Sequence, residues 1–403
     1  MNKQLADVSF LYPVEPELER LVQQKREEPF SAHAVAWLHA LSLILNRDPE
    51  TKRHPDVATF AFFCRKANVW QLKKLYYPVN SVRLGRGLVF HITPKNVPCT
   101  FAYSLASGIL SGNANIVKVS SENTEQADII CRATGELGRD KDHQPVSARQ
   151  MLVRYDRNSS ATAYFSSICD VRVIWGSDAT IDEVRKNKLP PRAFDLTFAS
   201  RYSLCVINAG KYLQNNMPRT VASGFYNDTY LFDQEACTSP HLIVWIGSDE
   251  NIETAKSTFW AQLYELVQSR YRLQPHAAVN KLTTFYHQAV QSEGIKKATM
   301  PDNLIWRTGL DALSKGIDQY RCNGGYFSES KASSISELAA IITGPYQTLS
   351  YYGIEKEELI DFITREKPDG VDSIVPIGRT TDFSLTRDGY NLIDTLSREI
   401  TIT

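Results

Sequence analysis

One cysteine of the sequence stands where a thiol can do chemistry. Residues 237–241 read Cys-Thr-Ser-Pro-His, and this small, polar stretch separates two apolar runs at 230–232 and 242–246. A cysteine in a turn between two regular elements is accessible, and its thiolate is a nucleophile. If a helix begins near Cys237, its unpaired backbone N–H groups also favour the thiolate. The sequence therefore makes Cys237 the candidate nucleophile.

Other cysteines and the histidines are weaker candidates. Four cysteines lie within apolar periodic segments, the pattern of small buried side chains: Cys64, Cys131, Cys169 and Cys205. His241 suggests a Cys–His dyad, but Pro240 breaks the local geometry and a protease base usually comes from distant sequence. His91 ends an apolar strand, which predicts a packed core histidine, and no pair of histidines has metal-ligand spacing. We therefore predict no metal site.

Phosphate-binding signals are present only in a weak form. Neither the Gly-x-Gly-x-x-Gly fingerprint nor a Gly-x-x-x-x-Gly-Lys-Ser/Thr loop occurs in the sequence. Polar turns nevertheless follow three apolar strands, which end at Ile92, Val119 and Trp175. The residues of interest at two of these strand ends are Lys118, Ser120, Ser121, Gly176 and Ser177. A lysine, hydroxyls and a glycine turn beside a helix N-terminus can hold a ribose and a pyrophosphate.

The elements that must position these residues alternate between strand and helix. Predicted strands at 87–92, 115–119, 151–155 and 171–175 are separated by predicted helices, of which the first two span 101–110 and 124–137. Such alternation predicts a parallel sheet with helices on both faces, and ligands at the carboxyl ends of its strands. A helical lead-in precedes this region, and the same pattern recurs beyond residue 204. We predict an α/β protein of two domains.

The domain limits follow from the same pattern and from the length of 403 residues, which exceeds one usual hydrophobic core. We predict a helical lead-in and nucleotide-binding domain at 1–205 and a catalytic domain carrying Cys237 at 206–380. The tail at 381–403 ends on a β-prone run that can pair with the edge of another strand.

Composition restricts the class of partner. Lys and Arg together number 45, as do Asp and Glu, so no basic excess indicates nucleic acid or an anionic membrane. Seven scattered cysteines without a Cys-x-x-Cys pair favour reduced thiols. No signal peptide and no run of about 18 apolar residues is seen, which predicts a cytoplasmic protein with a small-molecule substrate.

Five sequence blocks lie in order at 87–98, 110–119, 173–178, around Cys237, and at 374–379 with 388–390. Together they resemble the aldehyde dehydrogenase superfamily, and within it the LuxC-type acyl-CoA reductases. Their order agrees across residues 85–398. The resemblance implies an aldehyde dehydrogenase-like fold with two domains, each built on a mainly parallel sheet flanked by helices, and a C-terminal tail strand.

The resemblance also implies residue roles. Cys237 would be the nucleophile, and Asn96 with the Cys237 backbone N–H would stabilise the oxyanion. The cofactor would contact the strand ends of the first sheet, through Thr93, Pro94, Lys118, Ser120, Ser121, Trp175, Gly176 and Ser177. Lys118 would hold the adenosine ribose, and Gly176 and Ser177 would line the pyrophosphate site.

Two departures from the hydrolytic dehydrogenases matter. Thr197 occupies the position of the glutamate that activates water in those enzymes, so an acyl-enzyme should persist for reduction. Ser121 stands where NAD-preferring members carry a glutamate, with Glu122 displaced by one position. Losing that carboxylate removes a repulsion against a 2′-phosphate. We therefore expect NADPH as the cofactor rather than NADH.

The function expected from this resemblance is reduction of an activated acyl group, as a CoA thioester of a long-chain fatty acid, to the aldehyde through an S-acyl-cysteine. An acyl-protein synthetase would be a partner, as in the bioluminescence relatives. The resemblance also implies a homo-oligomer that assembles through the tail at 381–403 as its oligomerisation strand, as superfamily relatives do. Three alternatives remain open: an acyltransferase or acyl-carrying partner without reductase activity, a non-catalytic scaffold of the same fold, and a cysteine hydrolase.

Overall fold

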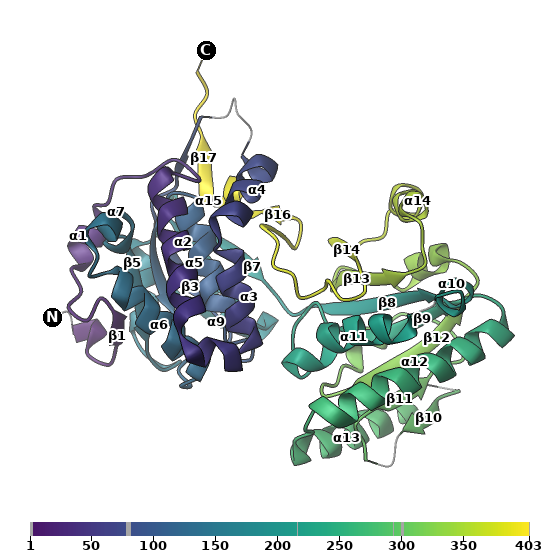
Figure 1. The fold of residues 1–403 in the computed structure, drawn as a ribbon. Helices are drawn as coiled ribbons and strands as arrows, with labels where there is room; N and C mark the ends of the chain where they lie inside the picture. Colours follow the sequence, from purple (N-terminus) through teal and green to yellow (C-terminus); the bar gives the residue numbers. More distant parts are fainter. Residues whose placement is uncertain (1–2, 78–81, 216, 293, 300–301, 403) are drawn as a thin grey trace. The chain divides into compact units, whose positions relative to one another are not determined.

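The chain forms two units, each with its own sheet. The computed structural model describes residues 3–77, 82–215, 217–292, 294–299 and 302–402 (Figure 1). Unit 1 comprises Met1–Ala199 with Phe383–Thr403, and unit 2 comprises Ser200–Asp382. The tail predicted at 381–403 thus belongs almost entirely to unit 1. Each unit is described below by itself.

Unit 1 is built on a six-stranded sheet with the order β1-β5-β4-β3-β6-β7. The strands are β1 (Ser9–Tyr12), β3 (Leu88–Ile92), β4 (Ala114–Lys118), β5 (Gln150–Arg154), β6 (Val171–Trp175) and β7 (Phe194–Phe198). All neighbours pair in parallel except β1, which runs antiparallel to β5 at one edge. The strand order reverses at β3, so β3 and β6 flank the position where ligands bind in such sheets.

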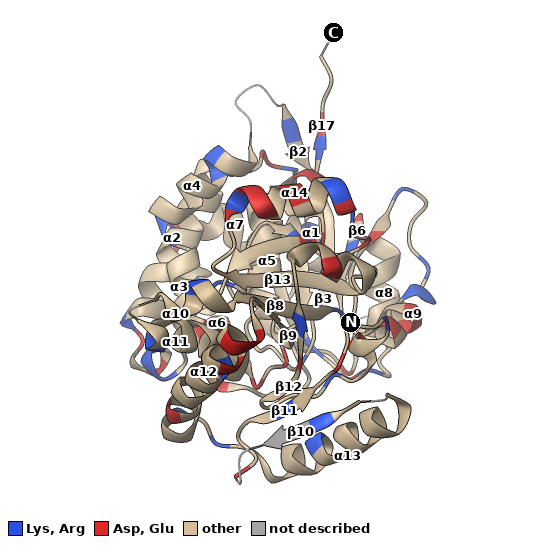
Figure 2. Cartoon of the chain, turned by 90° about the vertical axis from the view of Figure 1, so that its right-hand side faces the viewer, with Lys and Arg blue, Asp and Glu red and all other residues tan. Residues whose placement is uncertain are grey.

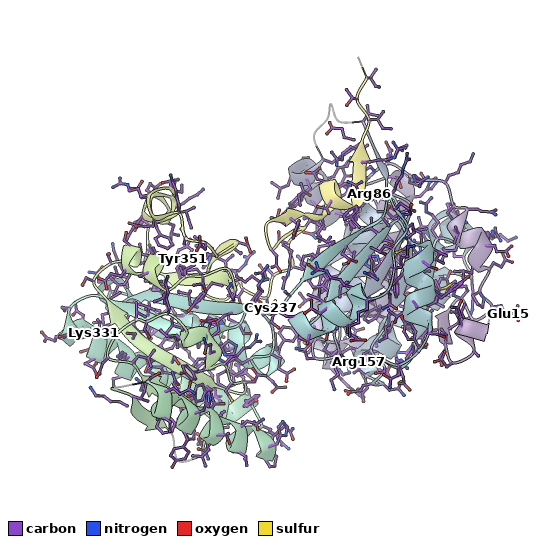
Figure 3. The ribbon with its side chains drawn as sticks, turned by 180° about the vertical axis from the view of Figure 1, so that it is seen from behind. Glu15, Arg86, Arg157, Cys237, Lys331 and Tyr351 are labelled. Carbon is purple, nitrogen blue, oxygen red and sulfur yellow. The ribbon has the colours of Figure 1, made fainter. Side chains whose placement is uncertain are left out.

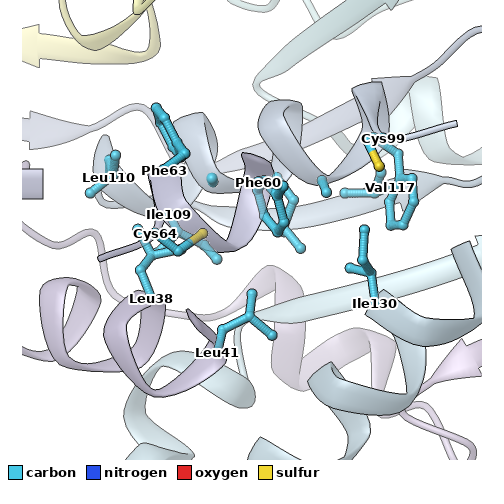
Figure 4. Packing of buried hydrophobic residues seen from close by; sticks show 14 of the residues in the cluster. Leu38, Leu41, Phe60, Phe63, Cys64, Cys99, Ile109, Leu110, Val117 and Ile130 are labelled. Carbon is cyan, nitrogen blue, oxygen red and sulfur yellow. The ribbon is translucent and has the colours of Figure 1, made fainter. Parts of the chain in front are cut away.

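Helices cover both faces of this sheet, as the alternation of strands and helices predicted. They are α1 (Leu18–Val22), α2 (Ala32–Arg47), α3 (Pro55–Phe63), α4 (Lys66–Tyr76), α5 (Thr100–Leu110), α6 (Glu125–Leu137), α7 (Gln144–Ser147), α8 (Ala161–Ile168) and α9 (Asp178–Arg185). On one face, α2, α3, α5 and α6 pack with Val89 and Val117 (Figure 4). On the other, α8 and α9 pack with Phe90 and Ile116. Neighbouring strand residues thus face opposite layers, as the pleat requires.

A chain of buried hydrogen bonds crosses the centre of this sheet. His91 contacts Ser104 through Nδ1 at 2.7 Å and Asn115 through Nε2 at 3.0 Å. Asn115 Nδ2 donates to Gln150 Oε1 at 2.8 Å, and Trp175 Nε1 donates to Ser104 Oγ at 3.0 Å. Burial lowers the pKa of His91 to about 4. The structure confirms His91 as a packed core histidine.

The C-terminal tail completes unit 1 and takes part in two small two-stranded sheets. It carries β15 (Thr386–Arg387), β16 (Tyr390–Asn391), α15 (Leu392–Leu396) and β17 (Ser397–Glu399). Strand β17 pairs antiparallel with β2 (Arg83–Gly85) of the same chain. The predicted β-prone tail therefore does form a strand, and its partner is a neighbouring edge in unit 1.

Unit 2 is built on a seven-stranded sheet with the order β10-β11-β12-β9-β8-β13-β14. The strands are β8 (Tyr202–Asn208), β9 (Pro240–Ile246), β10 (Lys296–Thr299), β11 (Trp306–Gly309), β12 (Tyr326–Ala332), β13 (Tyr346–Tyr352) and β14 (Ser373–Pro376). Within this sheet, β10 is the only described strand that runs antiparallel to its neighbour. This agrees with the mainly parallel sheet expected for the second domain.

Helices pack on both faces of the second sheet as well. They are α10 (Ala209–Leu213), α11 (Pro218–Thr229), α12 (Asp249–Arg270), α13 (Pro275–Gln291) and α14 (Lys356–Glu366). Ile243 and Trp245 of β9 pack against α11 and α12, while Val244 faces the layer that contains α14. Positive and negative side chains are interspersed on the outer helices, as on α14 (Figure 2). None of the described helices is long and apolar enough to cross a membrane.

The structure corrects several element boundaries. The apolar pattern of residues 211–225 predicts one helix, but α10 ends at Leu213 and α11 begins at Pro218, which suits the first turn of a helix. The polar residues 120–123 predict the cap of α6, but Thr124 caps it by accepting a hydrogen bond from Ala127 N. Strands β7 and β12 were not predicted, because β7 lacks an apolar run and the polar residues of β12 resemble a loop.

Candidate active site

Cys237 lies in a turn that joins η4, a short 3-10 helix at Tyr230–Phe232, to strand β9 (Figure 3). Its side chain is partly exposed, and the turn is closed by a hydrogen bond from Ser239 N to Ala236 O at 2.9 Å. This confirms the predicted turn between two regular elements. The next element is β9 and not a helix, so the conditional argument from a helix N-terminus does not apply.

Ser203, on the neighbouring strand β8, holds the backbone of Cys237 through a hydrogen bond. Ser203 is completely buried, and its Oγ donates to the carbonyl oxygen of Cys237 at 2.7 Å. The same Oγ accepts a hydrogen bond from Thr348 N of β13 at 3.2 Å. Because a buried carbonyl without a donor is costly, Ser203 holds Cys237 at the amino end of the sheet.

A buried arginine lies on the other side of the turn. Arg321 Nη2 donates to Glu235 O at 3.1 Å, and Nη1 donates to Arg201 O at 2.7 Å. Burial lowers the pKa of Arg321, and the nearby Cys237 opposes that shift because its thiolate favours the charged guanidinium. The cysteine therefore has a cation within electrostatic range.

His241 is a poor base for Cys237. The ring is buried in β9 and stacks on Tyr202 with centroids 5.6 Å apart. Burial, reinforced by the charge of Arg321, holds the pKa of His241 well below its usual range, against a backbone hydrogen bond with Cys322. Such a weakly basic imidazole takes up a thiol proton poorly at neutral pH. The structure thus disfavours the Cys–His dyad.

The other six cysteines are free thiols with less access or reactivity. Burial raises the pKa of Cys131, Cys169 and Cys205 to about 12 in each case. Five of the six are buried, and Cys131 on α6 is partly exposed. All seven cysteines are described in the structure. Cys131 is therefore a useful control for experiments on Cys237.

The helix that leads to the cysteine turn is tied to the loop after β14. Asp228 of α11 is completely buried, and its carboxylate accepts hydrogen bonds from Gly378 N at 2.6 Å and Thr380 N at 3.0 Å. Burial raises the pKa of Asp228 to about 6 although these hydrogen bonds act in the opposite direction. Gly224 lets this loop approach α11, since a Cβ there would lie 3.1 Å from Gly378 Cα.

In unit 1, predicted cofactor residues gather at the carboxyl ends of β3 and β4. Thr93 Oγ1 donates to the carbonyl oxygen of Lys118 at 2.8 Å, which joins the two strand ends. Lys118 Nζ lies 4.8 Å from the centroid of the Tyr155 ring, and burial lowers the pKa of this lysine. Pro94 follows Thr93 in the same turn and is partly buried. A fixed, half-buried lysine at a strand end suits a ribose or a phosphate.

The turn after β6 carries the second predicted group. Ser177 Oγ caps α9 by accepting from Thr180 N at 3.3 Å. A Cβ on Gly176 would lie 3.0 Å from Thr180 Cγ2, so a side chain would crowd this turn. Trp175 stacks on Phe198 with ring centroids 3.8 Å apart, which leaves its indole in a fixed plane. These features fit a pyrophosphate beside a helix N-terminus.

A feature that sequence reasoning missed lies beside Ser120. Arg154, at the end of β5, donates from Nε to Ser120 O at 2.9 Å and from Nη1 to Asn123 Oδ1. Glu122, the displaced carboxylate, accepts a hydrogen bond from Lys95 Nζ at 2.8 Å on the surface. The turn containing Ser121 is thus bordered by an arginine, which suits a 2′-phosphate.

Asn96 and Thr197 also lie at strand ends of unit 1. Asn96 is exposed in the turn between β3 and α5, and Thr197 is partly buried opposite Ile174 of β6. Since Asn96 and Cys237 belong to different units, the oxyanion role of Asn96 stays a prediction. Among the described residues, no cluster of three or more His, Cys, Asp or Glu could hold a metal ion.

Several solved structures with a similar fold are aldehyde dehydrogenases. The chain is similar to aldehyde dehydrogenase 21 from Physcomitrella patens, with a TM-score of 0.67, 12% identity, and coverage of 91% of this chain and 85% of that one. It is also similar to lactaldehyde dehydrogenase from Escherichia coli, with a TM-score of 0.64, 12% identity, and coverage of 92% and 86%. The fold is therefore that of the aldehyde dehydrogenases, as the sequence predicted.

The family is shown by a match that spans most of the chain. Residues 76–398 match the model of the family described as acyl-CoA reductase (LuxC). The chain belongs to this family.

Among its curated relatives are two long-chain acyl-protein thioester reductases. That of Aliivibrio fischeri is 28% identical over 167 residues, which cover 41% of this chain and 33% of the relative. That of Vibrio harveyi is 27% identical over 223 residues, which cover 54% and 44%. The matched stretch thus spans less than half the length of either relative.

Proposed function

We propose that this protein reduces a long-chain acyl thioester to the aldehyde with hydride from NADPH, through an S-acyl intermediate on Cys237. The observation that carries the proposal is the partly exposed Cys237, held by Ser203 and flanked by Arg321, in a chain of the acyl-CoA reductase family. The relatives named acyl-protein thioester reductases support a thioester substrate.

The first half of the reaction is acyl transfer. The Cys237 thiolate attacks the thioester carbonyl, the oxyanion is stabilised by Asn96 and the Cys237 N–H, and the carbon–sulfur bond to the leaving thiol breaks. Removing one such donor typically costs about 10²–10³ in rate. Ser203 keeps the Cys237 backbone in place during this step because it holds the carbonyl oxygen.

The second half needs a hydride, which a bound nicotinamide cofactor supplies. Thr93, Pro94, Lys118, Ser120, Ser121, Trp175, Gly176 and Ser177 would hold the cofactor. Arg154 beside Ser120 supports NADPH over NADH, since a guanidinium pairs well with a 2′-phosphate. The resulting thiohemiacetal collapses when its carbon–sulfur bond breaks and the electron pair returns to Sγ of Cys237.

Thr197 supports reduction rather than hydrolysis as the fate of the acyl-enzyme. A threonine hydroxyl has no basic pKa in the neutral range and cannot activate water as a carboxylate does. The acyl donor is proposed to be a CoA thioester or an acylated protein, the latter delivered by an acyl-protein synthetase. Both donors present the same thioester carbonyl to Cys237.

Oxidation of NADPH in the presence of acyl-CoA tests the proposal. Native protein and Cys131→Ala should consume one NADPH for each aldehyde trapped, while Cys237→Ala should consume none. Acylation of Cys237 without NADPH oxidation would support the acyltransferase instead. If iodoacetamide leaves Cys237 unmodified and no nucleotide binds, the non-catalytic scaffold is the better description.

A further inference from the structure

Arg321 is placed between the two backbone segments that border the cysteine turn. It lies in the loop before β12, and its guanidinium donates to Glu235 O, two residues before Cys237. It also donates to Arg201 O, two residues before Ser203, whose Oγ in turn holds the Cys237 carbonyl. The guanidinium is therefore fixed by two carbonyl oxygens, and its position follows the position of the turn.

Arg321 carries a permanent positive charge near the thiol of Cys237. Arginine stays protonated even when burial lowers its pKa, as it does here. His241 is neutral, because burial and the guanidinium both lower its pKa. Burial raises the pKa of Glu235, with Asp233 adding to the shift and Arg321 opposing it.

More distant titratable groups complete the surroundings. Burial strongly raises the pKa of Tyr202 and lowers that of Lys281 on α13 to about 8. The charge of Asp318 adds to the rise in the pKa of Tyr202, and the charge of His276 opposes the rise in the pKa of Glu235. Among the charges that act on Arg321, that of Cys237 affects its pKa most.

We propose that Arg321 is a positioning residue that holds a fixed positive charge beside Cys237 and stabilises its thiolate. The proposal rests on Cys237 being the nucleophile of the proposed function. The thiolate occurs twice in that reaction, first when Sγ attacks the thioester carbonyl and again when Sγ leaves the thiohemiacetal with the bonding electron pair. A fixed cation favours both events, because preorganised charge needs no rearrangement during reaction.

The local geometry favours arginine over lysine at this position. Two carbonyl oxygens on different segments accept from two different guanidinium nitrogens. A lysine ammonium is a compact charge and does not reproduce a planar fork of donors. Arg321→Lys should therefore keep part of the electrostatic effect and lose part of the fixation, whereas Arg321→Gln loses the charge.

The test measures the rate at which iodoacetamide alkylates Cys237 in the full-length protein between pH 5 and 10, followed by peptide mass spectrometry. In Arg321→Gln the rate at pH 7 should fall about tenfold, and the pH profile should move upward by about one unit with an unchanged plateau. Arg321→Lys should lie between this variant and the native protein. Arg201→Gln, which removes a positive charge but keeps the carbonyl that accepts from Arg321, should alkylate like the native protein.

An equal change in rate at every pH would show that Arg321 only shapes the turn, and an unchanged profile would show no role in thiolate formation. Either result overturns the proposal. If Arg321→Gln fails to fold, Arg321→Lys decides, since a profile identical to the native one contradicts the fork argument. Alkylation needs neither acyl donor nor cofactor, so a shifted profile in a protein without reductase activity would refute the proposed function alone.

Discussion

Replacing Ser203 with alanine should loosen the cysteine turn without exposing a new surface. Ser203 Oγ makes two buried hydrogen bonds, to Cys237 O at 2.7 Å and from Thr348 N at 3.2 Å. The variant deprives both backbone groups of this partner, and each such loss costs about 1–3 kcal/mol. We expect the free energy of unfolding to fall by about 3 kcal/mol.

Ser350→Ala is the matched control. Ser350 is also completely buried in the same sheet, and its Oγ donates to Leu204 O at the longer distance of 3.4 Å. Its loss should cost about 1 kcal/mol or less. The two variants remove hydrogen bonds from different groups of one sheet, and of the two only Ser203→Ala removes the partner of the Cys237 carbonyl.

Urea unfolding followed by circular dichroism measures the stability difference between Ser203→Ala and Ser350→Ala. The kcat/KM for acyl-CoA should fall about 10- to 100-fold in Ser203→Ala, because a small displacement of the nucleophile disturbs attack geometry. In Ser350→Ala it should stay near the native value. Equal losses of stability and activity in both variants would refute the argument that Ser203 positions Cys237.

Three further variants test other parts of the structure. His91 has a folded pKa of about 4 against 6.5 unfolded, so native stability should fall by about 3 kcal/mol as the pH drops from 6.5 to 4; His91→Gln should remove this slope in acid-dependent urea unfolding. Asp228 has a pKa of about 6 in the folded protein against 3.8 in the unfolded chain. Its stabilising contribution to folding is therefore complete below pH 3.8 and is lost as the pH rises through 6. Relative to Asp228→Asn, the free energy of unfolding of the native protein should decrease by about 3 kcal/mol over that range. Arg154→Gln should raise the KM for NADPH about tenfold and leave that for NADH unchanged, and equal effects on both cofactors would contradict a 2′-phosphate contact.

The sequence predicts the first sheet well because its strands are apolar and its turns are marked by Pro, Gly and Asn. Strands β3, β4, β5 and β6 lie within a residue or so of their predicted positions. Strand β12 escaped prediction because Ser328, Glu329 and Ser330 look polar, although all three are buried. Glu329 is stabilised there by Trp245 Nε1 at 3.0 Å, a partner that only the folded sheet supplies.

The residues of the candidate site also differ in whether a local sequence pattern marks them. Cys237 stands out in the sequence because its own neighbours form the turn. Arg321 does not, because it comes from 84 residues further along the chain and no local pattern marks it. Ser203 and Arg154 are likewise common residue types in ordinary strands, and only strand pairing shows which backbone atoms they contact. Residues that act through a long-range hydrogen bond leave no signal in a single sequence.

The central claim is that Cys237 carries the acyl group between donor and hydride. Intact-mass analysis after incubation with acyl-CoAs of increasing chain length tests it most directly. Without NADPH, the native protein and Cys131→Ala should gain the mass of one acyl group, and adding NADPH should remove it with release of one aldehyde. Cys237→Ala should gain no mass. An acyl adduct that forms in Cys237→Ala, or aldehyde production by that variant, would contradict the account.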